Sequence, residues 1–146
     1  MTHLRKQIRD EVVTRLESLP GFTGKVQASR VYAVQKSPYV IVYTGTEEAL
    51  SNVIARPSYS ERTLTVNVEI YSKAGTDLFD TQIDNLAELI EPELDTTPGK
   101  FEMCQTWQYL GLNVDYSGAG EKAAGVATLE YEFTYRVAES DPTTGV

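Results

Sequence analysis

The fold of this chain is decided by residues 127–137, which read ATLEYEFTYRV. Apolar and aromatic side chains alternate with polar ones along this stretch. Successive side chains of a β-strand point to opposite faces of the sheet, so the alternation predicts a half-buried antiparallel strand. Residues 64–71, which read LTVNVEIY, repeat the same pattern. The chain is therefore predicted to build a sheet with one apolar face and one polar face.

Two amphipathic helices are predicted beside these strands. The first runs from an N-cap at Thr2 to about Leu19, where Pro20 and Gly21 end it. The second begins at Thr76 or Asp77 and ends or bends near Pro92. Apolar residues recur every three or four positions in both, as a core-facing stripe requires. The stripes are Leu4, Ile8, Val12, Leu16 and Leu19 in the first, and Leu78, Phe79, Ile83, Leu86, Ala87, Ile90 and Leu94 in the second.

The remaining segments complete an α+β pattern. Strands are predicted at residues 25–33, 39–43, 62–72 and 104–116, the second buried on both faces and the last interrupted near Leu110 and Gly111. Residues 44–62 are predicted to be a long loop, and residues 117–125 a shorter one. The order predicts a mainly antiparallel β-sheet with two α-helices packed on one face. We expect a single domain over residues 1–137 and a polar tail over residues 138–146.

The composition of the chain limits which classes of function are plausible. The chain has 146 residues, one cysteine and no apolar run near the roughly 20 residues of a membrane span. Cys104 has no partner for an internal disulfide, and the charged N-terminus does not resemble a signal peptide. These features predict a soluble protein of a reducing cytoplasm with no membrane partner. Thirteen Lys and Arg against 21 Asp and Glu give a net charge of −8, which disfavours binding to nucleic-acid phosphates.

Catalytic and metal-binding patterns are weak. His3 is the only histidine and stands at the terminus, where fraying is expected, and Cys104 lacks a second histidine as a base. Glu130 and Glu132 stand about 7 Å apart on one strand face, a spacing that glycosidase pairs use, but a solvated or interface face is favoured. The sequence therefore predicts no enzyme, no cofactor and no metal site.

Two further patterns have simpler structural explanations. Acidic residues on one face of the second helix, Asp77, Asp80 and Asp84, are explained by stabilisation of the helix N-terminus. Residues 118–123, GAGEKA, match a loose dinucleotide fingerprint but precede a strand instead of a helix. A hairpin loop is the interpretation there.

Candidate interface residues gather in the predicted long loop. Arg56, Tyr59 and Arg62 are of the types that anchor protein partners, and no core requirement explains Tyr59 there. Glu47 and Glu48 make the start of this loop acidic. We predict a subunit or partner interface at these five residues, with a purely structural role for Tyr59 left open.

The arrangement resembles the tail terminator (minor tail protein U-like) family of long-tailed phages with non-contractile tails. Three places carry the resemblance: the helix that begins HLR and ends RLE, residues 38–45 (PYVIVYTG) leading into the acidic residues 47–48, and residues 129–135 (LEYEFTY). The order of elements matches from residue 2 to about residue 137, although no single motif is diagnostic.

The resemblance implies a structural virion protein with a tail-tube-like fold, assembled in the host cytoplasm. It implies a six-subunit ring that caps the head-proximal end of the tail tube, stops tube polymerisation and provides the surface for head joining. Its partners would be copies of itself, the tail tube protein and a head-completion or neck protein. DNA would pass through the lumen without specific binding, past an acidic face carrying Glu130 and Glu132.

Two alternatives remain beside this interpretation. One is another neck or tail-completion protein of the same fold class, which joins head and tail. The other, more remote, is a small hydrolase that uses carboxylates. Ring formation separates both virion roles from the hydrolase, and overgrown tails on deletion separate the terminator from the neck protein.

Overall fold

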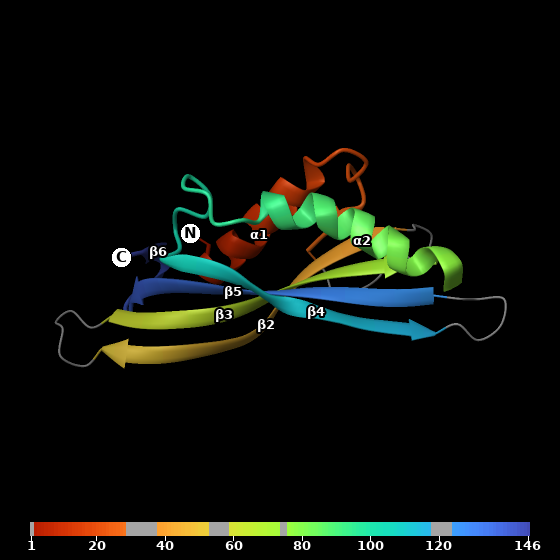
Figure 1. Ribbon diagram of the computed structural model, residues 1–146. Coiled ribbons are helices and arrows are strands. Elements are labelled where there is room, and N and C mark those ends of the chain that lie inside the picture. Colours follow the sequence, from red (N-terminus) through yellow and green to blue (C-terminus); the bar gives the residue numbers. More distant parts are fainter. Residues whose placement is uncertain (1, 29–37, 53–58, 74–75, 118–123) are drawn as a thin grey trace.

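The computed structural model describes residues 2–28, 38–52, 59–73, 76–117 and 124–146. Within these ranges, two helices lie on one face of a six-stranded sheet, and no described helix lies on the other face (Figure 1). The predicted α+β class is confirmed. The elements are α1 (Leu4–Glu17), β1 (Val26–Gln27), β2 (Tyr39–Asn52), β3 (Tyr59–Ser72), α2 (Thr76–Glu93), β4 (Thr106–Ser117), β5 (Ala124–Ala138) and β6 (Asp141–Gly145).

The sheet is almost entirely antiparallel. Among the described strands the order is β1-β2-β3-β5-β4, β6 pairs with β5, and β1 alone runs parallel to its neighbour, β2. The two alternating stretches lie side by side, with Val66 opposite Tyr131 and Val68 opposite Leu129. Their apolar side chains are at most 2% exposed and form the core with the helices: Leu64, Val66, Val68 and Ile70 of β3, and Ala127, Leu129, Tyr131, Phe133, Tyr135 and Val137 of β5.

Helix α1 buries the predicted stripe, but its ends differ from the prediction. His3, not Thr2, is the N-cap, and its side chain accepts a hydrogen bond from the Arg5 backbone N–H. The imidazole of His3 thus caps the helix in place of the Thr2 hydroxyl that the sequence predicts. The helix ends at Glu17, with Ser18 as C-cap, and Leu19 lies beyond it.

Helix α2 packs on the same sheet face. Phe79, Ile83 and Ile90 are buried as predicted, and Pro92 lies in the last turn. The inclusion of Leu78 in the core stripe is wrong, because its side chain is 64% exposed. Phe79 approaches the backbone of Gly125 so closely that a Cβ there would lie 2.3 Å from the Phe79 ring. Only glycine at this position therefore allows α2 to pack closely against β5.

The predicted long loop over residues 44–62 is instead largely a β-hairpin. β2 continues to Asn52 and β3 begins at Tyr59; residues 53–58, including Arg56, lie outside the described part. A bulge between Thr44 and Glu47 shifts the register, and most of β2 beyond it is exposed. A strand exposed on both faces needs no apolar alternation, which is why the sequence pattern missed it.

Three other predicted segments can be compared with the structure. The strand predicted at residues 25–33 is seen as the two-residue β1, since residues 29–37 lie outside the described part. The predicted interruption of β4 is confirmed as a bulge at Leu110, between Tyr109 and Gly111. The predicted fingerprint-like loop at residues 118–123 is not described.

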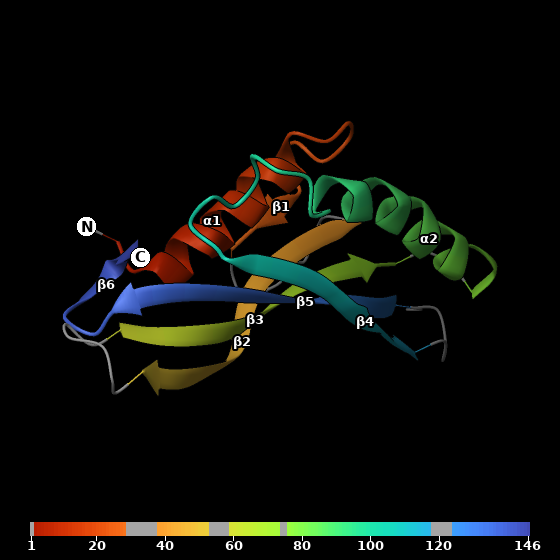
Figure 2. The ribbon, with the colours of Figure 1, turned by 60° about the vertical axis from the view of Figure 1, so that its left-hand side comes forward.

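The C-terminal segment, predicted to be a polar tail, contains β6. The Val146 backbone N–H donates to the Arg136 carbonyl over 3.0 Å, and the Gln7 side chain donates to the Thr143 carbonyl over 2.9 Å. The segment therefore lies against α1, and the two chain ends meet at one end of the molecule (Figure 2). Backbone pairing holds it, which a polar sequence does not reveal. The division of the chain at residue 137 stays a prediction.

No helix in the described ranges is long and apolar enough to span a membrane.

Candidate functional site

The open face of the sheet is the first candidate functional surface. It is formed by the half-buried polar side chains that alternate with the core residues of β3 and β5. Both helices lie on the opposite side (Figure 1). We call this surface the open face; its members are Glu61, Thr63, Thr65, Asn67 and Glu69 of β3, and Thr128, Glu130, Glu132, Thr134 and Arg136 of β5.

Glu130 and Glu132 lie in the middle of the open face, as the sequence predicts. Glu130 pairs in register with Asn67 and Gly111, and Glu132 pairs with Thr65 and Gln108. None of these neighbours carries a charge, and neither glutamate forms an ion pair with any residue that the structure describes. The two carboxylates therefore contribute an uncompensated negative potential.

The edges of the open face modify this charge. Arg136 donates from Nε to the Glu61 carboxylate over 2.9 Å, and its guanidinium lies 5.6 Å from the centre of the Tyr59 ring. Burial raises the pKa of Glu69 above its usual range. Glu61 is thus neutralised by Arg136, whereas Glu69, Glu130 and Glu132 form no ion pair with any described residue.

The base of the β2–β3 hairpin holds the second polar cluster. The Glu47 carboxylate accepts a hydrogen bond from the Tyr135 hydroxyl and lies 3.0 Å from Arg5 Nη1 and 4.0 Å from Arg62 Nη1. The Glu47 side chain is only 15% exposed. This cluster joins α1, β2, β3 and β5 through one carboxylate, and so holds the start of the hairpin against the helix layer.

The predicted interface residues separate into two groups. Glu47 and Arg62 are engaged within the chain, Arg62 also donating from Nε to Ser60 Oγ over 3.0 Å. Glu48 is exposed and stands opposite Thr63 on the open side of the hairpin, and Tyr59 is half-buried beneath Arg136. The interface assignment itself stays a prediction.

The candidates for chemistry do not assemble into a catalytic site in the described chain. The ring of His3 serves as a helix cap, and burial together with Arg5 lowers its pKa. Burial raises the pKa of Cys104 to about 12, so the thiolate needed for nucleophilic attack is disfavoured. No group of three or more His, Cys, Asp and Glu side chains suited to a metal ion occurs among the described residues.

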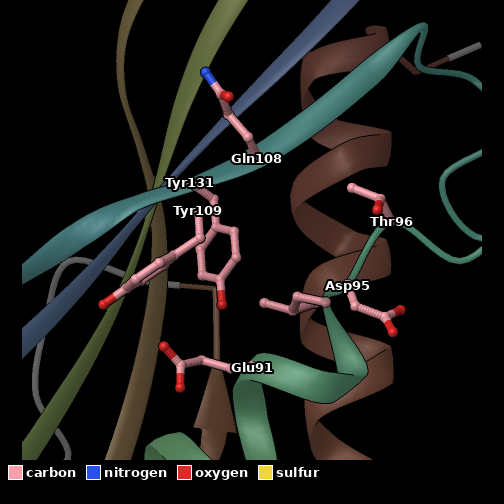
Figure 3. Close-up of a pocket in the computed structure, with 7 residues that line it drawn as sticks. Glu91, Asp95, Thr96, Gln108, Tyr109 and Tyr131 are labelled. Carbon is pink, nitrogen blue, oxygen red and sulfur yellow. The ribbon is translucent and has the colours of Figure 1, made fainter.

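The sequence does not predict a pocket of about 300 Å³ between the end of α2 and strand β4 (Figure 3). Its lining combines side chains from three elements and the segment after α2: Glu91, Leu94, Asp95, Thr96, Gln108, Tyr109 and Tyr131. Tyr131 was predicted only as a core residue, and no pattern singles out Glu91. The pocket depends on the pairing of β4 with β5, which no local signal encodes.

The comparisons with known proteins support the fold and leave the family open. A chain of a solved structure described as the virion of a native gene transfer agent (GTA) particle matches with a TM-score of 0.60. The match covers 89% of this chain and 95% of that chain at 11% sequence identity. No protein-family model matches, and no curated protein matches in sequence.

These findings define the chain as an α+β protein that shares its fold with a component of a virion particle. At 11% identity the likeness shows the fold alone, so the resemblance to the tail terminator family stays a prediction.

Proposed function

We propose that this protein is a structural component of a phage virion that forms a ring on the head-proximal end of the tail tube. The observation that carries the proposal is the shared fold with the gene transfer agent virion chain, which extends over 89% of this chain. The sequence resemblance to tail terminators gives the finer role: a six-subunit ring that ends tube polymerisation and provides the head-joining surface. Its partners are further copies of the chain, the tail tube protein and a neck protein.

The shape of the molecule is compatible with ring assembly. A ring of identical subunits needs two different contact patches on each subunit. The β2–β3 hairpin offers one, with Leu50 72% exposed, and the edge strand β4 offers another, with Leu110, Leu112 and Val114 each 43–45% exposed. β2 and β4 lie on opposite sides of the β3–β5 pair in the sheet. Two unlike patches pointing in different directions favour a head-to-tail contact over a two-fold dimer.

The open face suits the wall of a channel for DNA. Its carboxylates at Glu130 and Glu132, which have no ion-pair partner among the described residues, repel phosphate, and the chain as a whole carries a net charge of −8. A lumen lined by such faces would let DNA slide without binding it.

Electron microscopy of the purified protein over a wide concentration range tests ring formation. Rings of uniform diameter support the proposal. Deletion of the gene from its phage then tests the specific role, because loss of a terminator leaves overgrown tubes. Tails of normal length without heads would instead indicate the second candidate, a neck or tail-completion protein, which the same fold likeness also supports.

A further inference from the structure

The pocket between α2 and β4 has an apolar and aromatic floor with a carboxylate at its side. Tyr131 of β5 is 2% exposed and lies beneath Tyr109 of β4, with their ring centres 5.3 Å apart and the planes tilted by 56°. Leu94 closes the side toward the core. At about 300 Å³ the pocket lies at the lower end of the roughly 300–1,000 Å³ typical of ligand pockets, and fits the end of one long side chain.

The Tyr131 hydroxyl in this pocket is unsatisfied. Its oxygen is buried and has no hydrogen-bond partner in the described structure. A buried polar group without a partner costs about 1–3 kcal/mol, so its retention calls for an explanation. A ligand that donates a hydrogen bond to this oxygen would supply one.

The charge of the pocket comes from Glu91. Two carboxylates line the pocket, but Asp95 is already engaged, with Lys100 Nζ 2.7 Å from its Oδ1. Figure 3 shows the Asp95 carboxylate turned away from the tyrosine rings and the Glu91 carboxylate turned toward them. Glu91 forms no ion pair with any described residue. Its charge therefore remains available to a ligand.

We propose that this pocket binds the guanidinium group of an arginine side chain presented by another protein chain. The tyrosine rings offer faces for a planar cation, the Glu91 carboxylate balances its charge, and the Tyr131 hydroxyl accepts one of its N–H groups. Because the Tyr131 hydroxyl is buried, the proposal includes a movement of the half-exposed Tyr109 side chain that opens a path to it. The pocket lies beside an edge strand, where a neighbouring chain can approach, and the inference does not depend on the proposed ring.

Arginine fits this site better than other cations. A guanidinium is planar and carries five donors, so it can stack on a tyrosine and still reach both oxygens, whereas an ammonium is a more strongly hydrated point charge. Divalent metal ions prefer several oxygen ligands, and the pocket offers only one uncommitted carboxylate.

The binding test uses the intact protein and N-acetyl-arginine methylamide as the probe. NMR follows the ring resonances of Tyr109 and Tyr131 during the titration, with a dissociation constant of about 1–10 mM expected for a single side chain. The neutral isostere N-acetyl-citrulline methylamide serves as the ligand control. Spermidine, a small-molecule amine, tests the other source of a cation.

Three variants locate the binding. Glu91→Gln is expected to weaken binding by about tenfold, and Tyr131→Phe by about threefold to tenfold. Glu88→Gln, which changes the same charge on an exposed position of α2 outside the pocket, is expected to leave binding unchanged. Tyr131→Phe removes an unsatisfied hydroxyl, so its folding is not compromised.

Several results would overturn the inference. Equal binding of the citrulline analogue would show that charge plays no part, and equal weakening by Glu88→Gln would show a diffuse surface effect. Tighter binding of spermidine than of the arginine probe would assign the pocket to a free amine. The absence of any saturable shift up to about 50 mM would show that the pocket takes no cation of this class.

Discussion

Glu47 is the residue on which the base of the hairpin depends. Its carboxylate accepts from the Tyr135 hydroxyl and balances Arg5 and Arg62, and only 15% of its side chain is exposed. In the sequence Glu47 is simply one of two adjacent glutamates. In the structure the other, Glu48, is exposed. The two residues therefore form a matched pair for mutation.

Glu47→Gln is expected to destabilise the protein by about 1–2 kcal/mol, because two guanidinium groups lose their counter-charge. Glu48→Gln is expected to change the free energy of unfolding by less than about 0.5 kcal/mol. Urea denaturation of both variants measures the difference. Equal effects would show that the cluster contributes nothing beyond surface charge.

The partly buried Cys104 thiol and the buried Tyr135 phenol make the stability of the fold decrease at alkaline pH. Burial raises the pKa of Cys104 from 9.0 to about 12, and burial together with the hydrogen bond to Glu47 raises the pKa of Tyr135 from 10.0 to about 12. The folded chain holds both protons more tightly than the unfolded chain. Their stabilisation is complete below pH 9 and is lost as the pH rises toward 12.

The unfolding free energy is therefore expected to fall above about pH 9, by up to ~1.4 kcal/mol per pH unit for each group. In Cys104→Ala the onset is expected to move to about pH 10, where Tyr135 begins to titrate in the unfolded chain. Denaturation midpoints measured from pH 7 to 11 check this. An unchanged profile in the variant would remove Cys104 from the explanation.

At the scale of elements, β6 distinguishes a folded C-terminus from a solvated tail. It pairs with β5 through Val137–Gly145 and Ala138–Asp141, and its carbonyl at Thr143 binds Gln7 of α1. Each such bond contributes about 0.5–1.5 kcal/mol. The element thus ties the first helix to the last long strand.

Truncation after Glu139 is expected to destabilise the protein by about 1–3 kcal/mol, because these backbone bonds are lost. Gln7→Ala, which removes only the bond to Thr143, is expected to have a fraction of this effect. Thermal unfolding of the full chain and both variants makes the comparison. A truncated chain as stable as the full one would mean that β6 adds nothing to the fold.

At the scale of the whole molecule, the distribution of charge matters more than its sum. The carboxylates of Glu130 and Glu132, which form no ion pair with any described residue, lie together on the open face. The parent protein is expected to bind DNA with a dissociation constant above ~10⁻⁴ M at physiological salt. Replacement of both glutamates by lysine is expected to lower this dissociation constant by at least about tenfold.

The matched control reverses Asp84 and Glu88 on the exposed side of α2, with the same change in net charge. Fluorescence anisotropy with a labelled duplex compares the two double variants. A stronger effect on the open face supports its role as a channel wall. Equal affinities would show that only the net charge of the chain governs DNA exclusion.

The sequence by itself determined the elements whose side chains follow a fixed period. The alternation in residues 64–71 and 127–137 and the stripes of both helices gave the sheet, its core face and the helix layer. These patterns are visible because burial of one face imposes a period of two on a strand and about 3.6 on a helix. The interruption of the strand near Leu110 and Gly111 was also predicted from the sequence.

Only the tertiary structure decided the rest. The outer hairpin and β6 are held by backbone pairing, which leaves no period in side-chain type. Glu47 meets Tyr135 across 88 residues of chain, and Glu91 meets Tyr109 and Tyr131 across the α2–β4 junction. Such long-range contacts depend on strand register, which is itself set by residues distant in sequence. Neither the Glu47 cluster nor the pocket could therefore be predicted from the local sequence pattern.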